Sequence, residues 1–251
     1  MELAVIIPVL AMSDEMVEAR IDVLRQKALP TTNFRVYRSQ RGPGAIESRY
    51  DRQLAGDEVM RLACQAQRDG CEAAMVWCAG DPAVDAAREL VDIPVIGTGE
   101  AGMLFAYHLA QNFCILTGDE DLAATSYDVA VRSGLKGRLA AIRGIQMSVD
   151  QLRNDREAAL ANLTRVAKES VEKDGAHAFV FGCLALTGLG DELTRRVGLP
   201  VVDAAHCAVS LAESLVKMNL TYSRRTYAAP PVRMSEHQLL RFPGTKHGHT
   251  V

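Results

Sequence analysis

The sequence predicts an α/β protein made of two pseudo-symmetric, doubly wound lobes, each with a parallel sheet. Two observations support this fold class: short apolar runs alternate with longer amphipathic stretches, and the second half of the 251-residue chain repeats the first. Strands that alternate with helices form parallel sheets that are covered on both faces. The chain is long enough for each half to bury a core of its own.

Eight apolar runs have the length of buried strands, and amphipathic stretches separate them. In the stretch 57–70, apolar residues recur at the spacing of one helix face, namely Val59, Leu62, Ala63 and Ala66. The stretches 150–175 and 204–217 are also predicted to be helical. The predicted strands, in chain order, are residues 3–10, 34–37, 73–78, 94–97, 112–117, 138–144, 178–183 and 200–203.

The internal repeat divides the chain into halves. Residues 70–80 (GCEAAMVWCAG) align with 175–185 (GAHAFVFGCLA), and 93–110 align with 199–216. Each half therefore contains about four strands, as a small doubly wound unit does. The resulting lobes are expected to comprise residues 1–98 and residues 99–203, with the segment 204–251 packing back on the first lobe.

Composition excludes several classes of function. A net charge of −3 provides no basic surface for nucleic acid. No apolar run reaches the roughly 18 residues of a membrane helix. The apolar start, residues 1–10, lacks Lys and Arg, so it reads as a buried strand rather than an export signal. We therefore expect a cytoplasmic protein that binds neither membranes nor nucleic acid, with its cysteines reduced.

Two of the six cysteines occupy equivalent places in the repeat, Cys78 and Cys183, each at the end of a predicted strand. In open α/β sheets, ligands bind beyond the carboxyl ends of the strands, so these two thiols are expected to face one cleft. Helix N-termini after each cysteine would lower the thiol pKa. The alternative is that both are small buried fillers, as is expected of the other four, Cys64, Cys71, Cys114 and Cys207.

A thiolate and a thiol on opposite sides of a cleft suit the inversion of a carbon centre next to a carboxylate or amide carbonyl. One removes the proton and the other returns a proton to the opposite face. Backbone N–H groups at Ala79–Gly80 and Leu184–Ala185 would stabilise the developing oxyanion. No cofactor and no metal are expected, because the sequence lacks a dinucleotide fingerprint, a P-loop and metal-ligand spacing; the tail motif HGH (247–249) has no further ligands in range.

Four segments together resemble the aspartate/glutamate/hydantoin racemase superfamily, most closely its hydantoin and allantoin racemase branch. They are RGPGAIESRYD (41–51), CAGDPAVDAARE (78–89), PVIGTGEAG (94–102) and LPVVDAAHCAVSLAESL (199–215). The resemblance implies two lobes with a small-molecule substrate between them, and Cys78 and Cys183 as the acid and base. We also expect a homo-oligomer. The expected substrate-binding residues are Pro8, Ala79, Gly80, Thr117, Gly118, Leu184 and Ala185.

The chain also departs from this branch. The loop after the first strand, IPVLAMSD (7–14), keeps Pro8 but lacks the polar Asn and Thr of the branch, and Leu184 replaces a smaller or more polar residue. An α-substituted carboxylate or a hydantoin with an apolar substituent is therefore expected to be a better substrate than allantoin. Two alternatives remain: a related isomerase or decarboxylase of the superfamily, and a non-catalytic two-lobed binder.

Overall fold

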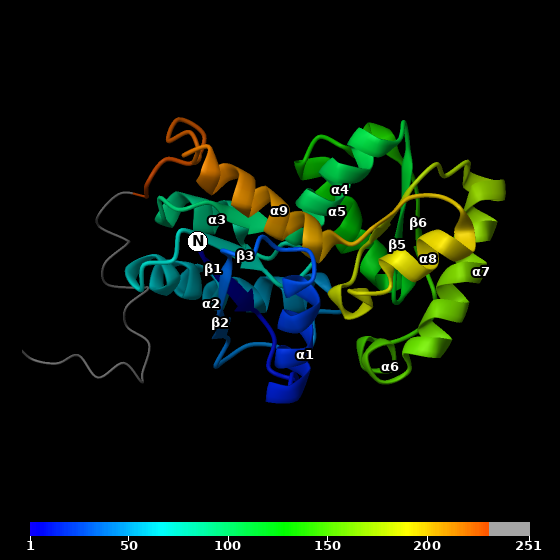
Figure 1. The fold of residues 1–251 in the computed structure, drawn as a ribbon, viewed down its shortest axis with the longest axis horizontal. Coiled ribbons are helices and arrows are strands. Elements are labelled where there is room, and N and C mark those ends of the chain that lie inside the picture. The colour runs from blue at the N-terminus through cyan, green and yellow to red at the C-terminus, as the bar shows by residue number, and fades with distance from the viewer. Residues whose placement is uncertain (231–251) are drawn as a thin grey trace, which may run out of the picture.

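The computed structural model describes residues 1–230 and contains two parallel four-stranded sheets (Figure 1). The strand orders are β2-β1-β3-β4 and β6-β5-β7-β8, so the two halves have the same topology. The predicted fold class and all eight predicted strands are confirmed. The strands are β1 (Glu2–Ile7), β2 (Asn33–Arg38), β3 (Ala73–Val76), β4 (Val95–Gly97), β5 (Phe113–Thr117), β6 (Leu139–Gly144), β7 (Phe179–Phe181) and β8 (Val201–Val202).

Helices flank both sheets, and several begin at side-chain caps that the sequence provides. Ser13, Ser48 and Asp155 each accept a hydrogen bond from a backbone N–H of the helix that follows. The helices are α1 (Asp14–Arg25), α2 (Arg49–Arg68), α3 (Val84–Leu90), α4 (Thr98–Leu109), α5 (Ala123–Arg132), α6 (Val149–Asn154), α7 (Arg156–Asp174), α8 (Gly190–Val197) and α9 (Ala204–Lys217).

Helices α4 and α9 lie side by side between the two sheets (Figure 1). Helix α4 contacts β7 and β8 of the second sheet, and α9 contacts β3 and β4 of the first. Small residues allow this close approach: a Cβ added at Gly102 would lie 2.8 Å from the Ala204 Cβ. One hydrophobic core cluster contains residues from both sheets. The lobe boundaries at 98 and 203 stay a prediction.

Three local features differ from the sequence-based expectation. Strands β3 and β7 end two residues before Cys78 and Cys183, so both cysteines lie in the loops after the strands. Cys78 is followed by turns rather than by a helix, whereas Cys183 begins a single 3₁₀ turn, Leu184–Leu186. The predicted helix 150–175 is two helices, because Asp155 (ψ 79°) ends α6 and caps α7.

Among residues 1–230, no helix is both long and apolar enough to cross a membrane. Within the same range, no group of three His, Cys, Asp or Glu side chains is arranged to hold a metal ion. The HGH motif (247–249) and residues 231–251 of the segment 204–251, which was predicted to pack on the first lobe, lie outside the described residues.

Candidate active site

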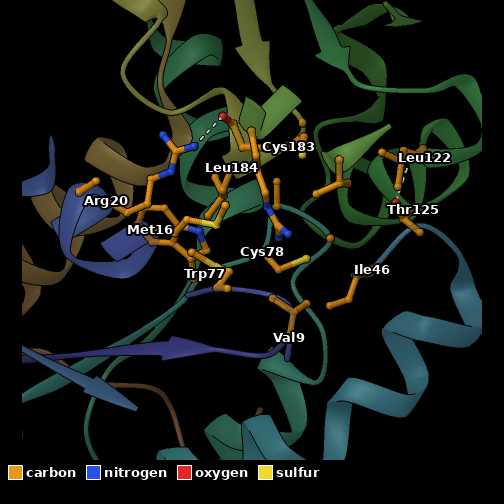
Figure 2. A pocket seen from close by; sticks show the side chains of 18 of the residues that line it. Val9, Met16, Arg20, Ile46, Trp77, Cys78, Leu122, Thr125, Cys183 and Leu184 are labelled. Atoms are coloured by element: carbon orange, nitrogen blue, oxygen red, sulfur yellow. Dashed lines mark hydrogen bonds between the residues drawn. The ribbon is translucent and has the colours of Figure 1, made fainter. Parts of the chain in front are cut away.

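Cys78 and Cys183 line the same cavity, which has a volume of about 250 Å³ and lies between the two halves. Cys78 follows β3, which lies next to β1, and Cys183 follows β7, which lies next to β5. The shared topology therefore places the two thiols at equivalent points. Figure 2 shows Met16 and Arg20 on one side of the cavity, Leu122 and Thr125 on the other, and the two cysteines between them. All six cysteines are free.

The loop that carries Cys78 is fixed by a buried carboxylate. Asp81 has a left-handed backbone (φ 47°), and its carboxylate accepts hydrogen bonds from the N–H groups of Gly99 and Glu100 at 2.8 and 2.9 Å. It also pairs with Arg132 of α5 at 3.0 Å. Asp81 therefore ties the loop after β3 to the N-terminus of α4 and to the second half of the chain.

The two thiols do not have the lowered pKa values that the sequence reasoning expected. Burial raises the pKa of Cys78 to about 12, although the N–H of Gly80 opposes the rise. Burial also raises the pKa of Cys183, opposed first by the N–H of Ala185 and then by nearby arginines. Removal from water disfavours a thiolate more than the loop N–H groups favour it.

The thiols also influence each other. A negative charge on Cys183 raises the pKa of Cys78, so ionisation of one cysteine disfavours ionisation of the other. Such coupled groups lose their protons in two separate steps. Over the interval between those steps, the pair consists of one thiolate and one thiol.

Most of the predicted site residues reach this cavity. Ala79, Gly80, Leu184 and Ala185 line it together with the two cysteines. Among the described residues, the lining does not include Pro8, Thr117 or Gly118. The Thr117 side chain is fully buried at the end of β5, and its hydroxyl has no hydrogen-bond partner within residues 1–230.

Several lining residues were not anticipated from the sequence, above all three arginines. The remaining lining side chains are mostly apolar, and they come from loops and helices far apart in the chain. Their convergence depends on how the two halves pack, so it could not be predicted even for those that lie in the segments described above. The lining residues that were not anticipated, with the three arginines included, are Val9, Met12, Met16, Ala19, Arg20, Ile46, Trp77, Leu122, Thr125, Val149, Arg153, Arg156 and Gly182.

Four polar residues outside the cavity lining have structural partners. Glu100 binds Arg88, and Glu47 accepts a hydrogen bond from the Val149 N–H at 3.1 Å. Asp203 caps α9, and His206 hydrogen-bonds the Val23 carbonyl at 3.0 Å. The filler interpretation is confirmed for three of the other four cysteines, which are buried; Cys64 is half-buried.

Comparison with known proteins identifies the family. The model of the Asp/Glu/Hydantoin racemase family matches residues 5–212. The hydantoin racemase of Paenarthrobacter aurescens is 32% identical over 220 residues, which cover 87% of this chain and 93% of that protein. The hydantoin racemase of Pseudomonas sp. (strain NS671) is 33% identical over 190 residues, covering 75% of this chain and 76% of that protein.

The solved structures agree with the sequence comparison. Allantoin racemase from Klebsiella pneumoniae superposes with a TM-score of 0.86 at 29% identity, over 92% of this chain and 94% of that one. Glutamate racemase from Francisella tularensis shares the fold alone, with a TM-score of 0.62 at 16% identity over 88% and 84% of the two chains. The protein belongs to the Asp/Glu/hydantoin racemase family and is a racemase, an isomerase of this superfamily.

Proposed function

We propose that this protein is a cofactor-independent racemase that uses Cys78 and Cys183 as acid and base at a carbon next to a carbonyl group. The observation that supports this most strongly is the entry of both thiols into one cavity from equivalent loops of the two halves. The substrate class is a hydantoin-like ring amide or a related carboxylate, as the names of the relatives suggest.

The reaction needs two proton transfers on opposite faces of one carbon. The thiolate removes the proton, and the electron pair of the broken C–H bond moves into the adjacent carbonyl to form an enolate. The opposite thiol then gives its proton to the other face, so the two cysteines exchange protonation states. The charge of a Cys183 thiolate raises the pKa of Cys78, which supports an ionised Cys183 paired with a protonated Cys78 in this scheme.

The cavity lining supports a substituted substrate. Trp77, Ile46, Leu122 and Leu184 are large and apolar, and a polar group left unpaired against them would cost about 1–3 kcal/mol. Allantoin is therefore expected to react more slowly than a hydantoin with an alkyl-containing substituent. We also expect a homo-oligomer, supported by the exposed apolar side chains of α4, namely Leu104, Phe105, Tyr107 and Leu109.

The test replaces each thiol with a hydroxyl, which is too weak an acid to ionise at this position. Cys78→Ser and Cys183→Ser should each reduce racemisation of a 5-substituted hydantoin by about 10²–10⁴-fold. Each variant should retain exchange of the carbon-bound hydrogen in heavy water for one enantiomer only, because one face keeps its base. Exchange is measured by NMR and inversion by polarimetry.

The matched control is Cys64→Ser, because Cys64 lies on α2 and outside the cavity lining. It should keep wild-type activity, and circular dichroism should show that all three variants are folded. Wild-type rates in both Cys78→Ser and Cys183→Ser would refute the two-thiol mechanism.

A further inference from the structure

Three arginines enter the cavity at the junction of the two halves. Arg20 lies on α1 of the first half, whereas Arg153 and Arg156 lie on α6 and α7 of the second. Asp155, where α6 ends and α7 begins, separates Arg153 from Arg156, and both arginines line the cavity. The Arg153 side chain is only 10% exposed. We call these three residues the arginine cluster.

Two members of the cluster are bound by neutral oxygens. Arg20 donates to the carbonyls of Ala185 and Thr187, both at 3.3 Å. Arg156 donates to the same two carbonyls at 3.1 and 2.8 Å. The loop after Cys183 therefore orients two guanidinium groups without neutralising either of them. A guanidinium has five N–H donors, so both can still bind a ligand.

The positive charge of the third member, Arg153, is also largely uncompensated. Arg153 donates to the Ala11 carbonyl at 2.7 Å, which links α6 to the first half. Its nearest carboxylate is that of Asp150, at 3.7 Å, and this side chain is 82% exposed. An exposed pair at such a distance contributes little.

The charged side chains that line the cavity are therefore all positive. Of the described residues that line it, three are arginines and none is Asp or Glu. Burial, together with repulsion by Arg156 and Arg153, lowers the pKa of Arg20 to about 10, although the charges of Cys183 and Asp203 oppose this change. Holding cations together away from water is unfavourable unless an anion binds them. One thiolate at Cys183 would offset only part of this charge. Asp203 also favours the charged forms of Arg20 and Arg156, but it does not line the cavity.

We infer that the arginine cluster binds a carboxylate on the substrate, so that the preferred substrates are hydantoin-type rings with an acidic substituent at the stereocentre. This inference rests on the proposed function, since it assigns a substrate to the same cavity. Guanidinium groups pair with carboxylates through two parallel hydrogen bonds, which explains why arginine suits this position. The apolar lining then accommodates the ring and the alkyl link.

The experiment compares two substrates that differ only in charge. They are the hydantoin with a 5-carboxyethyl group and the hydantoin with a 5-carbamoylethyl group, which has nearly the same shape but is neutral. Wild-type kcat/KM, measured by hydrogen exchange in heavy water, should be about 10- to 100-fold higher for the acid. Equal values, or a preference for the carboxamide, would overturn the inference.

Variants separate substrate binding from a general effect on the thiols. Arg156→Gln should lower the ratio of kcat/KM for the acid to kcat/KM for the carboxamide by about 10- to 100-fold. Arg165→Gln is the matched control, because Arg165 lies on α7 but pairs with Glu169 at the surface. Equal losses for both substrates in Arg156→Gln would show that the cluster serves only the thiolate or the fold.

Binding is measured separately by calorimetry, so that the two proposals can fail independently. If neither hydantoin exchanges its hydrogen, the proposed function fails. Tighter binding of the acid than of the carboxamide, lost in Arg156→Gln, would still support the carboxylate site. Equal binding of the two compounds, or no binding of either, would overturn the site as well.

Discussion

At the scale of single residues, the two thiols have similar positions but different electrostatic surroundings. Arg153 and Arg20 favour a thiolate at Cys183. At Cys78, the charge of Asp81 disfavours a thiolate and Arg52 is a minor opposing influence. The symmetry of the fold therefore does not extend to the acidity of its two cysteines.

This difference predicts selective alkylation. Iodoacetamide at about pH 8 should modify Cys183 faster than Cys78, because the thiolate is the reacting form. Mass spectrometry of peptides sampled over time would give the two rates. The buried cysteines, Cys71, Cys114 and Cys207, serve as the internal control and should react more slowly than either. Faster modification of Cys78 would contradict the electrostatic assignment.

At the scale of the elements, the start of α4 determines where the Cys78 loop lies. A Cβ added at Gly99 would be 2.0 Å from the Ala79 carbonyl oxygen, which belongs to the backbone and cannot move alone. Gly99 therefore allows the loop and the helix N-terminus to touch. The Asp81 hydrogen bonds described above act across the same contact.

Replacing this glycine tests the contact. Gly99→Ala should displace the Cys78 loop, destabilise the protein by about 1–3 kcal/mol and reduce kcat. Gly137→Ala is the control, because nothing lies within 4 Å of a Cβ at that position. Urea denaturation and the racemisation assay give the two readouts. Wild-type stability and kcat in Gly99→Ala would mean that the loop does not depend on this contact.

At the scale of the whole molecule, one of the hydrophobic core clusters spans both halves, so the halves should unfold together. Met75 and Ile96 of the first sheet belong to the same core cluster as Ile115 and Val180 of the second. Trp77 is the only tryptophan and lies in the first half. Its fluorescence and the far-ultraviolet circular dichroism should therefore change at the same urea concentration. Two separated transitions would show independent lobes.

The sequence predicted the fold and the pair of cysteines because both follow from local patterns. Apolar runs mark strands, and the repeat places Cys78 and Cys183 at equivalent points. The arginine cluster was not predictable in this way, because Arg20 is distant in sequence from Arg153 and Arg156 and only the packed halves bring them together. The break at Asp155 was missed because the helical pattern continues through it.

The unequal surroundings of the two thiols have a thermodynamic consequence in the proposed mechanism. Mirror-image substrates have the same free energy, so catalysis cannot make either direction more favourable at equilibrium. The ratio kcat/KM must therefore be the same for both enantiomers, however strongly the arginines favour a thiolate at Cys183 over one at Cys78. The difference between the two thiols can therefore affect kcat and KM only together, so that the enantiomer with the larger kcat also has the larger KM. After one turnover that starts from a Cys183 thiolate, the proton is on Cys183. The enzyme must return a proton to Cys78 and ionise Cys183 before it can convert the same enantiomer again.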